Sequence, residues 1–581
     1  MDTQSKKVVD VVYTDGEIII HANAPPAQAI FIQAGRVATV GSNAEVLLAA
    51  AGKSVPTISL DGAVVMPGLV DTHPHLLHFA AFAGSLLDIT NAKDHADILK
   101  VIREDAKKKP RGRWIMLSPV GELHWFHRRS YKDLEEGCLP DRYTLDIASS
   151  DHPVVIAALA PKCPNIVAFN SMALAILGIG RDTPDRVDDV YIEKDNNGYP
   201  TGILRGQVSG YYNYDPFFAG LLRKMPSMIQ PELVPHSLMR AMNNYSAMGI
   251  TTIYEGHAME FNQIEAYQAF QAKGLLSLRV KACPELTPGS LPTDPVLTTA
   301  QVQSNLEKAA AMRQEHDDWL RIDGVTTCPY GPVDMGCMLW KQGYLSPTGE
   351  LTTGRRGVSE EHLELAFDFC ARRGLRLNLC SVSPDEHDDH LAMTQKVMDK
   401  YNLNRTGWIL QHGMLIRPDH LTKLAALGFD MTVSAAFTYG NGDRFRERVG
   451  PECLEHLNPF RLLLDAEGLN VAASMDWGPT NPFEQMQLAV THEMYPSRRT
   501  NAGPQQVVTR AEALDMWTRQ GARVLGWEGI GELSPGSHAD LAIVDRNPIT
   551  CDLAALPGAR VLRTLVGGRV VYDDGTLPSV L

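Results

Sequence analysis

Apolar runs that end in polar residues recur along most of the 581-residue chain, with helical stretches between them. The first run covers residues 63–70 and ends in the polar stretch 71–75. Strands of parallel sheets give such continuous runs because helices cover both faces of the sheet. Seven later runs have the same form, at residues 249–255, 277–282, 321–327, 375–380, 407–412, 429–434 and 469–476. Strands that alternate with helices in this way predict an α/β fold with a parallel (β/α)8 barrel.

Between the first and second runs lie too many residues for one loop. Residues 96–240 contain further apolar strands at 113–117 and 153–157, and we therefore expect an insertion with its own fold. Insertions at the C-terminal face of a barrel usually shape the active site. Among the helices, residues 359–373 carry apolar side chains at a period near 3.6 and end at Gly374, which is typical of a C-terminal cap.

The two ends of the chain follow a different pattern of short strands and tight turns. Near the N terminus the turns are Asp15-Gly16 and Ala34-Gly35, and near the C terminus Gly567-Gly568 separates two apolar segments. A short strand is also expected at residues 531–533. Gly- and Asp-containing pairs between strands are typical of β-hairpins. Both ends are therefore predicted to be β-structure.

Composition and charge exclude several classes of partner. The apolar content of 44% and charged content of 21% are those of an ordinary globular protein, and the length predicts two or three domains. A net charge of −14 argues against a nucleic-acid or anionic-membrane partner. The chain shows no signal peptide and no run of about 18 apolar residues, so we expect a cytoplasmic protein. Its nine cysteines, without a CxxC pair, fit reduced thiols.

Polar residues at three of the predicted strand ends can form a metal site. His73 and His75 follow the first run, and side chains two residues apart on a strand point to the same side. His412 ends the sixth run and Asp476 ends the eighth. The carboxyl ends of barrel strands meet at one face, where active sites form. Neutral imidazole and carboxylate suit zinc, with iron or manganese as alternatives.

The stretch 67–75 resembles the first barrel strand of the amidohydrolase superfamily. Later stretches are similar to the branch that contains N-substituted formamide deformylase, amidohydrolase family 3, and the resemblance covers nearly the whole chain. It implies a metal-dependent hydrolase that acts as a homodimer, with a small β-sandwich domain built from both termini. The expected units are residues 1–65 and 529–581 for that domain, 66–95 for the first barrel strand and the segment after it, 96–240 for the insertion and 241–528 for the rest of the barrel.

The resemblance also implies roles for individual residues. His412 matches the ligand on the sixth strand, and Asp476 matches the eighth-strand aspartate that contacts the metal and takes the proton of the attacking water. Two family positions differ. Thr326 stands where the fourth strand usually carries a carboxylated, bridging lysine, and Cys380 stands where the fifth strand usually ends in histidine. Without these groups we expect one divalent metal ion, not two.

For other candidate site residues, a purely structural role is the alternative. Glu255, at the end of the second strand, is a candidate metal ligand, or a buried carboxylate paired with Lys281 or Arg279. His257, two residues further on, is a candidate catalytic residue that faces the substrate. Cys380 is a candidate for substrate binding, with a thiolate ligand or a small core residue as the alternatives.

Three further residues are expected near the substrate or its entrance. His124 and Trp125 belong to an aromatic-rich piece of the insertion that can form an apolar lid or pack on the surface. Trp477 directly follows Asp476 and is a candidate for substrate binding. The acidic and histidine-rich segment 385–390 follows a proline and fits the start of a helix, where acidic residues suit the dipole, better than a metal site.

The sequence thus predicts a hydrolase of small molecules in which one divalent ion polarises a water molecule and a substrate carbonyl group. Asp476 is the expected general base, and His257 is expected to support the oxygen of the tetrahedral intermediate. From the family, the bond is an amide C–N bond in a small, partly apolar substrate. Hydrolysis of a lactone or a C–C bond is the alternative on the same site. A non-catalytic barrel that has lost its metal is the alternative from another class of protein.

Overall fold

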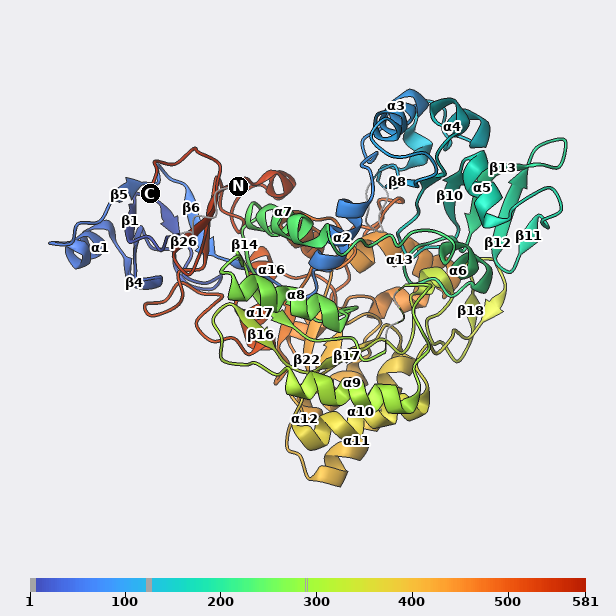
Figure 1. Cartoon of the computed structure of the whole chain (residues 1–581). Coiled ribbons are helices and arrows are strands. Elements are labelled where there is room, and N and C mark those ends of the chain that lie inside the picture. Colours follow the sequence, from blue (N-terminus) through green and yellow to red (C-terminus); the bar gives the residue numbers. More distant parts are fainter. Residues whose placement is uncertain (1–6, 122–127, 288, 290, 581) are drawn as a thin grey trace.

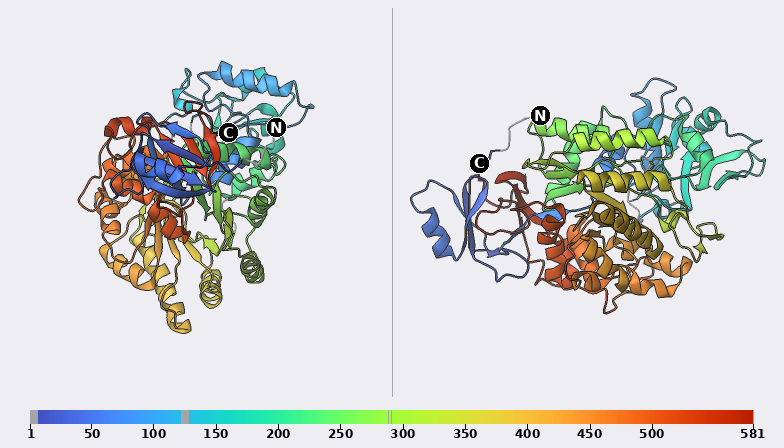
Figure 2. Two further views of the ribbon diagram at one scale, coloured as in Figure 1. Left: turned by 90° about the vertical axis from the view of Figure 1, so that its left-hand side faces the viewer. Right: turned by 90° about the horizontal axis from the view of Figure 1, so that it is seen from below.

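The structure is a computed structural model that describes residues 7–121, 128–287, 289 and 291–580. The two chain ends lie together in a β-rich unit at one end of the molecule, an α/β unit occupies the centre, and the insertion lies at the opposite end (Figures 1 and 2). Within the described residues, no helix combines the length and apolar character needed to cross a membrane.

The terminal β-domain consists of two sheets whose strands come from both ends of the chain. The sheets have the orders β4-β3-β1-β5 and β2-β6-β24-β25-β26. In the second sheet β6 pairs antiparallel with β24, so that Val65 lies opposite Ile543. Side chains of both sheets, such as Ile32 and Leu565, share one buried apolar cluster. The elements are β1 (Val11–Thr14), β2 (Glu17–Ile18), β3 (Ala29–Gln33), β4 (Arg36–Gly41), α1 (Asn43–Ala50), β5 (Thr57–Ser59), β6 (Val64–Pro67), β24 (Leu541–Val544), β25 (Val561–Val566) and β26 (Arg569–Asp573).

Two details of this domain differ from the sequence prediction. Residues 531–533 lie outside any strand, and the backbone N–H of Leu533 donates to the carbonyl oxygen of Ile20. Helix α1 was not predicted, although Ser42 and Glu45 form a capping box that marks its start.

A buried ion pair joins the terminal β-domain to the central unit. Arg279 of the central unit contacts Asp540, with Nε to Oδ2 at 2.6 Å and Nη2 to Oδ1 at 3.0 Å, and both side chains are 1% exposed. Oδ1 of Asp540 also accepts a hydrogen bond from the backbone N–H of Gly567. Removal of either charge would leave the other buried without a partner, which is strongly destabilising. Arg279 is therefore engaged by Asp540 and not by Glu255.

The central unit contains a four-stranded and a five-stranded sheet, in the orders β16-β15-β14-β7 and β17-β20-β21-β22-β23. All neighbours in both sheets are parallel. Strands β16 and β17 follow each other in the chain, and Gly324, at φ +88°, lies between them and joins the two sheets. The strands are β7 (Leu69–Asp71), β14 (Ile250–Glu255), β15 (Arg279–Ala282), β16 (Leu320–Ile322), β17 (Val325–Thr327), β20 (Leu377–Cys380), β21 (Ile409–Gln411), β22 (Asp430–Val433) and β23 (Val471–Ala473).

The first and last of these strands approach each other at their carboxyl ends. In the described part of the chain no ladder joins β7 to β23, so closure of the predicted barrel stays a prediction. Other hydrogen bonds do connect them: Thr72 Oγ1 donates to the carbonyl oxygen of Ala473 at 2.9 Å, and the N–H of Asp476 donates to the carbonyl oxygen of His73 at 2.9 Å. The ends of the two strands therefore lie side by side.

Helices surround the two parallel sheets (Figure 1). The predicted helix at 359–373 is found as α10, which starts after Ser359, whose side chain accepts from the N–H of His362, and ends at Gly374 with φ +63°. The helices of this unit are α2 (Leu76–Ser85), α7 (Val234–Ser246), α8 (Phe261–Ala272), α9 (Thr299–Ala311), α10 (Glu360–Arg373), α11 (Pro384–Tyr401), α12 (Pro418–Leu427), α13 (Ala436–Arg448), α14 (Phe460–Leu464), α15 (Pro482–Thr491), α16 (Arg510–Met516) and α17 (Arg519–Leu525).

The insertion forms a six-stranded sheet with the order β11-β12-β13-β10-β9-β8. The predicted strands at 113–117 and 153–157 are present as the parallel pair β8 and β9, whereas the other four strands were not predicted. The elements are α3 (His95–Ala106), β8 (Ile115–Leu117), α4 (Arg142–Ala148), β9 (Val154–Ile156), β10 (Asn165–Phe169), α5 (Ser171–Leu177), β11 (Arg186–Val187), β12 (Val190–Lys194), β13 (Pro200–Gly206) and α6 (Pro216–Leu222). A short hairpin of β18 (Tyr344–Leu345) and β19 (Leu351–Thr352) lies elsewhere, in the segment after β17.

Candidate metal centre

Four side chains meet where β7, β21 and β23 end. His73 and His75 follow β7, His412 directly follows β21, and Asp476 lies three residues beyond β23. His75, His412 and Asp476 have left-handed backbone conformations, with φ of 50°, 77° and 50°. Such conformations are uncommon for residues other than glycine and often occur at functional sites, where the surrounding structure supports the strain. The sharp turns at these strand ends direct the side chains toward one another.

The spacing of the four side chains suits a single metal ion. His73 Nε2 lies 3.1 Å from His75 Nε2. Asp476 Oδ1 lies 3.6 Å from His75 Nε2, and its Oδ2 lies 3.8 and 3.5 Å from Nε2 of His73 and His412. Ligand atoms that each lie about 2.0–2.1 Å from a tetrahedral ion are roughly 3.4 Å apart. The observed distances therefore leave room for one ion among these atoms.

Burial keeps these imidazoles in the form that binds metals. Desolvation, reinforced by the neighbouring imidazoles, holds the pKa of His73 well below its ordinary value. Burial likewise lowers the pKa of His412 to about 4. Both rings are then neutral at pH 7, with a lone pair available for a ligand bond.

Asp476 adds a buried carboxylate to these neutral rings. It is 2% exposed, burial raises its pKa, and its Oδ2 has no hydrogen-bond partner. A buried carboxylate oxygen without a donor is costly unless a cation compensates it. The four residues therefore fit a bound divalent ion.

Asp71 holds the backbone of the segments that carry His73 and Asp476. Its Oδ1 accepts hydrogen bonds from the backbone N–H groups of His73 and Met475, each at 3.1 Å. It is fully buried, and burial raises its pKa to about 7. One carboxylate thus fixes the backbone of both segments that carry candidate ligands. Groups behind a metal site commonly orient its ligands in this way.

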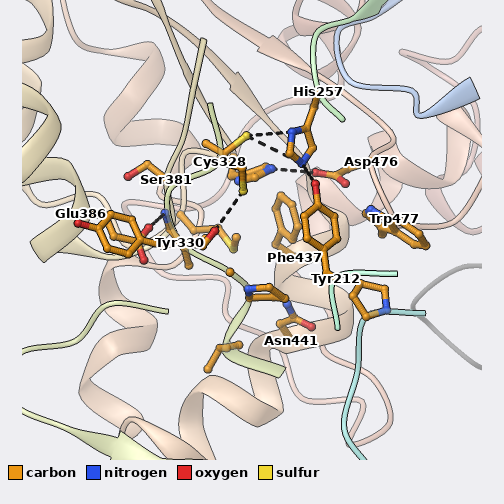
Figure 3. A pocket seen from close by; sticks show the side chains of 18 of the residues that line it. Tyr212, His257, Cys328, Tyr330, Ser381, Glu386, Phe437, Asn441, Asp476 and Trp477 are labelled. Atoms are coloured by element: carbon orange, nitrogen blue, oxygen red, sulfur yellow. Dashed lines mark hydrogen bonds and ion pairs between the residues drawn. The ribbon is translucent and has the colours of Figure 1, made fainter. Parts of the chain in front are cut away.

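His257 lies beside the four residues, after β14. Its ring centroid is 5.2 Å from the rings of both His73 and His75. On one side its Nε2 forms a 2.5 Å hydrogen bond with the hydroxyl group of Tyr212, and Figure 3 shows both residues next to Asp476. On the other side its Nδ1 lies 3.3 Å from Glu285 Oε2. The ring therefore lies between the candidate metal centre and a second polar group.

A pocket opens onto these side chains, and its empty space, open solvent included, is about 580 Å³. Of the residues predicted near substrate, His257, Cys380 and Trp477 line it. Trp477 also packs edge-on against Phe79, with ring centroids 4.9 Å apart. The other lining residues include the apolar and aromatic side chains of Tyr212, Tyr330, Val333, Met414, Phe437 and Phe445.

Glu255 does not join the candidate centre. Its Oε1 accepts hydrogen bonds from the N–H of Leu77 and the hydroxyl group of Tyr267, both at 2.8 Å, and burial raises its pKa to about 7. It belongs to none of the groups of converging ligand atoms found among the described residues. The side chain turns toward helices α2 and α8, away from the histidines. The expected pairing with Lys281 or Arg279 is wrong as well.

Thr326 does not belong to the candidate metal centre. Thr326 is buried, donates a hydrogen bond to the carbonyl oxygen of Gly256 and accepts one from Asn378 Nδ2 at 3.1 Å. It does not line the pocket, whereas Cys328, two residues further on, does. His124 and Trp125 lie outside the described residues, so their lid role stays a prediction.

The histidine-rich segment 385–390 starts a helix, as its sequence indicates. Helix α11 begins at Pro384, and Ser383 forms a capping box with Glu386. Asp388 does lie near His420, but the guanidinium group of Arg417 contacts it at 3.0 Å. An existing cationic partner makes this cluster a weaker candidate for a metal.

Three residues of the site were not predicted from the sequence. Cys328 and Glu285 follow β17 and β15. Polar residues at other strand ends were expected to face the site, and the same rule would have found these two. Tyr212 comes from the insertion, and no motif in the sequence marks it.

A parallel α/β unit with imidazoles and a carboxylate converging at the strand ends is typical of metal-dependent hydrolases. The chain belongs to the amidohydrolase family, whose model matches residues 56–572, as the resemblance predicted. It is 27% identical over 568 residues to N-substituted formamide deformylase from Arthrobacter pascens, which covers 94% of this chain and 95% of that protein.

Solved structures show a similar fold. An uncharacterized metal-dependent hydrolase from Pyrococcus horikoshii has a TM-score of 0.69 at 20% identity, and the match covers 94% of this chain and 99% of that one. An adenosine deaminase from Xanthomonas campestris with bound zinc has a TM-score of 0.52 at 15% identity, with 98% and 94% covered. At these identities the likeness concerns the fold alone.

Proposed function

We propose that this metal-dependent hydrolase cleaves an amide C–N bond in a small, partly apolar substrate. The catalytic ion, with zinc as the first choice and iron or manganese as alternatives, would be held by His73, His75, His412 and Asp476. The observation that carries the proposal is Asp476 Oδ2, a buried oxygen without a hydrogen-bond donor that lies 3.5 Å from the Nε2 atom of a neutral His412. When bound, a divalent ion supplies a water of lowered pKa and polarises a carbonyl group.

The side chains of the site then have separate tasks in the reaction. Asp476 accepts the proton of the attacking water at its carboxylate and returns it to the leaving amine, as a general base and then a general acid. His257 lies beside His73 and His75 and can donate from Nε2 to the carbonyl oxygen of the substrate. In the structure the hydroxyl group of Tyr212 is the hydrogen-bond partner of Nε2, and the substrate oxygen would take its place.

The pocket and the relatives support the choice of substrate class. Trp477, Phe437 and Tyr212 supply aromatic surface beside the candidate metal centre, which suits an apolar group on the acyl or amine side. The relative from A. pascens is named for hydrolysis of N-substituted formamides, which contain an amide C–N bond. N-substituted formamides and other N-acyl amines are therefore the first compounds to test.

The barrel, the β-sandwich and the domain boundaries are also part of the proposal. The two parallel sheets would form the halves of a (β/α)8 barrel, and the two terminal sheets would form a β-sandwich. The boundaries near residues 65, 95, 240 and 528, the homodimer and the cytoplasmic location are likewise proposals from the sequence and the family.

Metal content and a substrate screen test the function together. The protein is purified without chelator, its metal is measured by mass spectrometry, and the metal-loaded form is assayed on N-acyl amines, N-acyl amino acids and aryl lactones. Turnover of an amide that chelation abolishes and added zinc restores supports the proposal. Faster turnover of a lactone would favour the alternative reaction on the same site. A stable protein that binds no metal at neutral pH would instead indicate a non-catalytic barrel.

A further inference from the structure

A second group of ligand atoms lies on the far side of His257. One ligand atom each of His257, Cys328 and Cys380 lies within 4.8 Å of the others. Cys380 Sγ is 3.2 Å from His257 Nδ1, and Glu285 Oε2 is 3.3 Å from the same nitrogen. The four residues follow or end four different strands, β14, β15, β17 and β20. Figure 3 shows Cys328 on the side of His257 opposite Asp476.

The types of atom in this group point to one kind of ligand. Two thiols and an imidazole nitrogen form a set that binds zinc, and sulfur selects for thiophilic metals over magnesium or calcium. These atoms come from strand ends, which are held in place by the sheet, and both Cys380 and His257 are buried. Neither sulfur takes part in a disulfide bond.

We propose that His257 Nδ1, Cys328 Sγ and Cys380 Sγ form a second metal site, with Glu285 beside it, that binds a thiophilic divalent ion such as zinc or cadmium. This ion would be additional to the one expected from the sequence. It would lie next to the candidate catalytic centre, with the imidazole of His257 between the two. Cys380 would thus replace the missing histidine of the family at its own position, and the unpredicted Cys328 would supply a second sulfur ligand.

The surroundings of each ligand are compatible with this role. The Glu285 carboxylate, beside the three ligands, accepts from the backbone N–H groups of Ala258 at 3.0 Å and Cys328 at 3.1 Å, so its position is fixed. Cys380 Sγ donates to Gln411 Oε1 at 3.2 Å, and Cys328 Sγ donates to the carbonyl oxygen of Tyr330 at 3.1 Å. On metal binding each thiol gives its proton to solvent and forms one sulfur–metal bond, so two protons leave for each divalent ion bound.

The second site would also define the protonation of His257. A metal at Nδ1 leaves the proton on Nε2, because a neutral imidazole carries one proton and offers one lone pair. That N–H then faces the hydroxyl group of Tyr212. A metal-bound ring with a fixed donor on its other nitrogen is a common way to orient a catalytic imidazole.

Spectroscopy of the wild-type protein provides the first test. Metal is removed by chelation under reducing conditions, and the protein is titrated with cadmium while the ultraviolet absorption of sulfur-to-cadmium charge transfer is recorded. X-ray absorption is then measured on the zinc-loaded form. We expect two ions per chain and zinc–sulfur scattering at about 2.3 Å. Absence of sulfur from the first shell of every bound ion would overturn the proposal.

Variants separate the two sites from each other. Cys328→Ser/Cys380→Ser is expected to bind one ion without sulfur ligands, whereas Cys138→Ser/Cys551→Ser, which removes two thiols elsewhere, is expected to bind two ions like wild type. His73→Ala/His412→Ala is expected to keep one ion, with the sulfur signal intact. Retention of two ions after loss of Cys328 and Cys380 would contradict the second site.

The same experiments distinguish failure of this site from failure of the proposed function. If the wild type binds one ion without sulfur and hydrolyses amides, the second site is wrong and the proposed function stands. If the protein binds its ion through sulfur and hydrolyses none of the compounds, the second site stands and the proposed function is wrong. The sulfur signal of the wild type needs no substitution, so a variant that fails to fold does not remove the test.

Discussion

The backbone N–H of Asp476 donates a 2.9 Å hydrogen bond to the carbonyl oxygen of His73. These residues lie 403 positions apart in the chain, after β23 and β7. The proposed general base and a proposed metal ligand are therefore connected through the backbone as well as through their side chains.

Asp71→Ala is expected to weaken zinc binding by about 10- to 100-fold, which is typical for loss of a group that orients metal ligands. The substitution leaves the N–H groups of His73 and Met475 without their acceptor. Asp71→Asn keeps one oxygen at this position and is expected to retain most of the affinity. Zinc affinity is measured by competition with a chelator of known affinity. Equal affinities for wild type and Asp71→Ala would show that Asp71 has no positioning role.

Asp476→Asn is expected to lower kcat by about 10²- to 10⁴-fold, the usual range for loss of a general base. The amide keeps the shape of the side chain but cannot take up a proton, while three imidazoles still offer ligand nitrogens. Metal content and KM are expected to change much less than kcat. Steady-state kinetics and metal analysis of the same preparation provide the measurement. A kcat within about threefold of wild type would exclude Asp476 as the base and make His257 the candidate.

His73→Ala and His412→Ala are each expected to abolish hydrolysis and to remove the ion of the candidate catalytic centre. Both side chains lie beyond the strand ends, so the sheets are expected to fold without them. His362→Ala, on the half-exposed surface of α10, removes an imidazole elsewhere and is the matched control. Circular dichroism and crystallographic anomalous scattering monitor the fold and the ion. An ion of full occupancy at this position in both variants would refute the ligand assignment.

Lys281 is expected to make stability depend on pH above neutrality. Its Nζ donates to the carbonyl oxygen of Leu525 at 2.8 Å, and burial, with a contribution from Arg376, lowers its pKa to about 7. Between pH 7 and about 10 the unfolded chain binds more protons at this lysine than the folded one. The free energy of unfolding therefore rises with pH between 7 and about 10, by at most ~1.4 kcal/mol per pH unit from this group. The gain is lost as the pH falls back to the folded pKa of about 7.

Lys281→Met lacks this proton equilibrium and isolates its effect. The melting temperature of the variant minus that of wild type is expected to be larger at pH 7 than at pH 9. Loss of the hydrogen bond to Leu525 shifts this difference equally at both pH values. Thermal denaturation at pH 7, 8 and 9 measures the difference. Parallel pH profiles for the two proteins would mean that Lys281 titrates normally in the folded state.

The sequence by itself determined the parts of this protein that depend on local pattern. The apolar runs marked every strand of the two parallel sheets, because a buried strand must be apolar on both faces. The ends of those runs gave His73, His75, His412 and Asp476, whose atoms the structure brings to within 3.1–3.8 Å of a neighbour in the group. The family was likewise recognisable from residues 67–75 and the stretches that follow.

The tertiary structure alone decided which strand-end side chains meet. Glu255 and His257 are two residues apart, yet one turns to Leu77 and Tyr267 and the other to Tyr212 and Cys380. Strand alternation predicts the direction of a side chain only while the strand stays regular, and His257 lies beyond the end of β14. Beyond that point, direction depends on partners that are distant in sequence. The contact of Cys380 with His257 spans 123 residues, and no local pattern contains it.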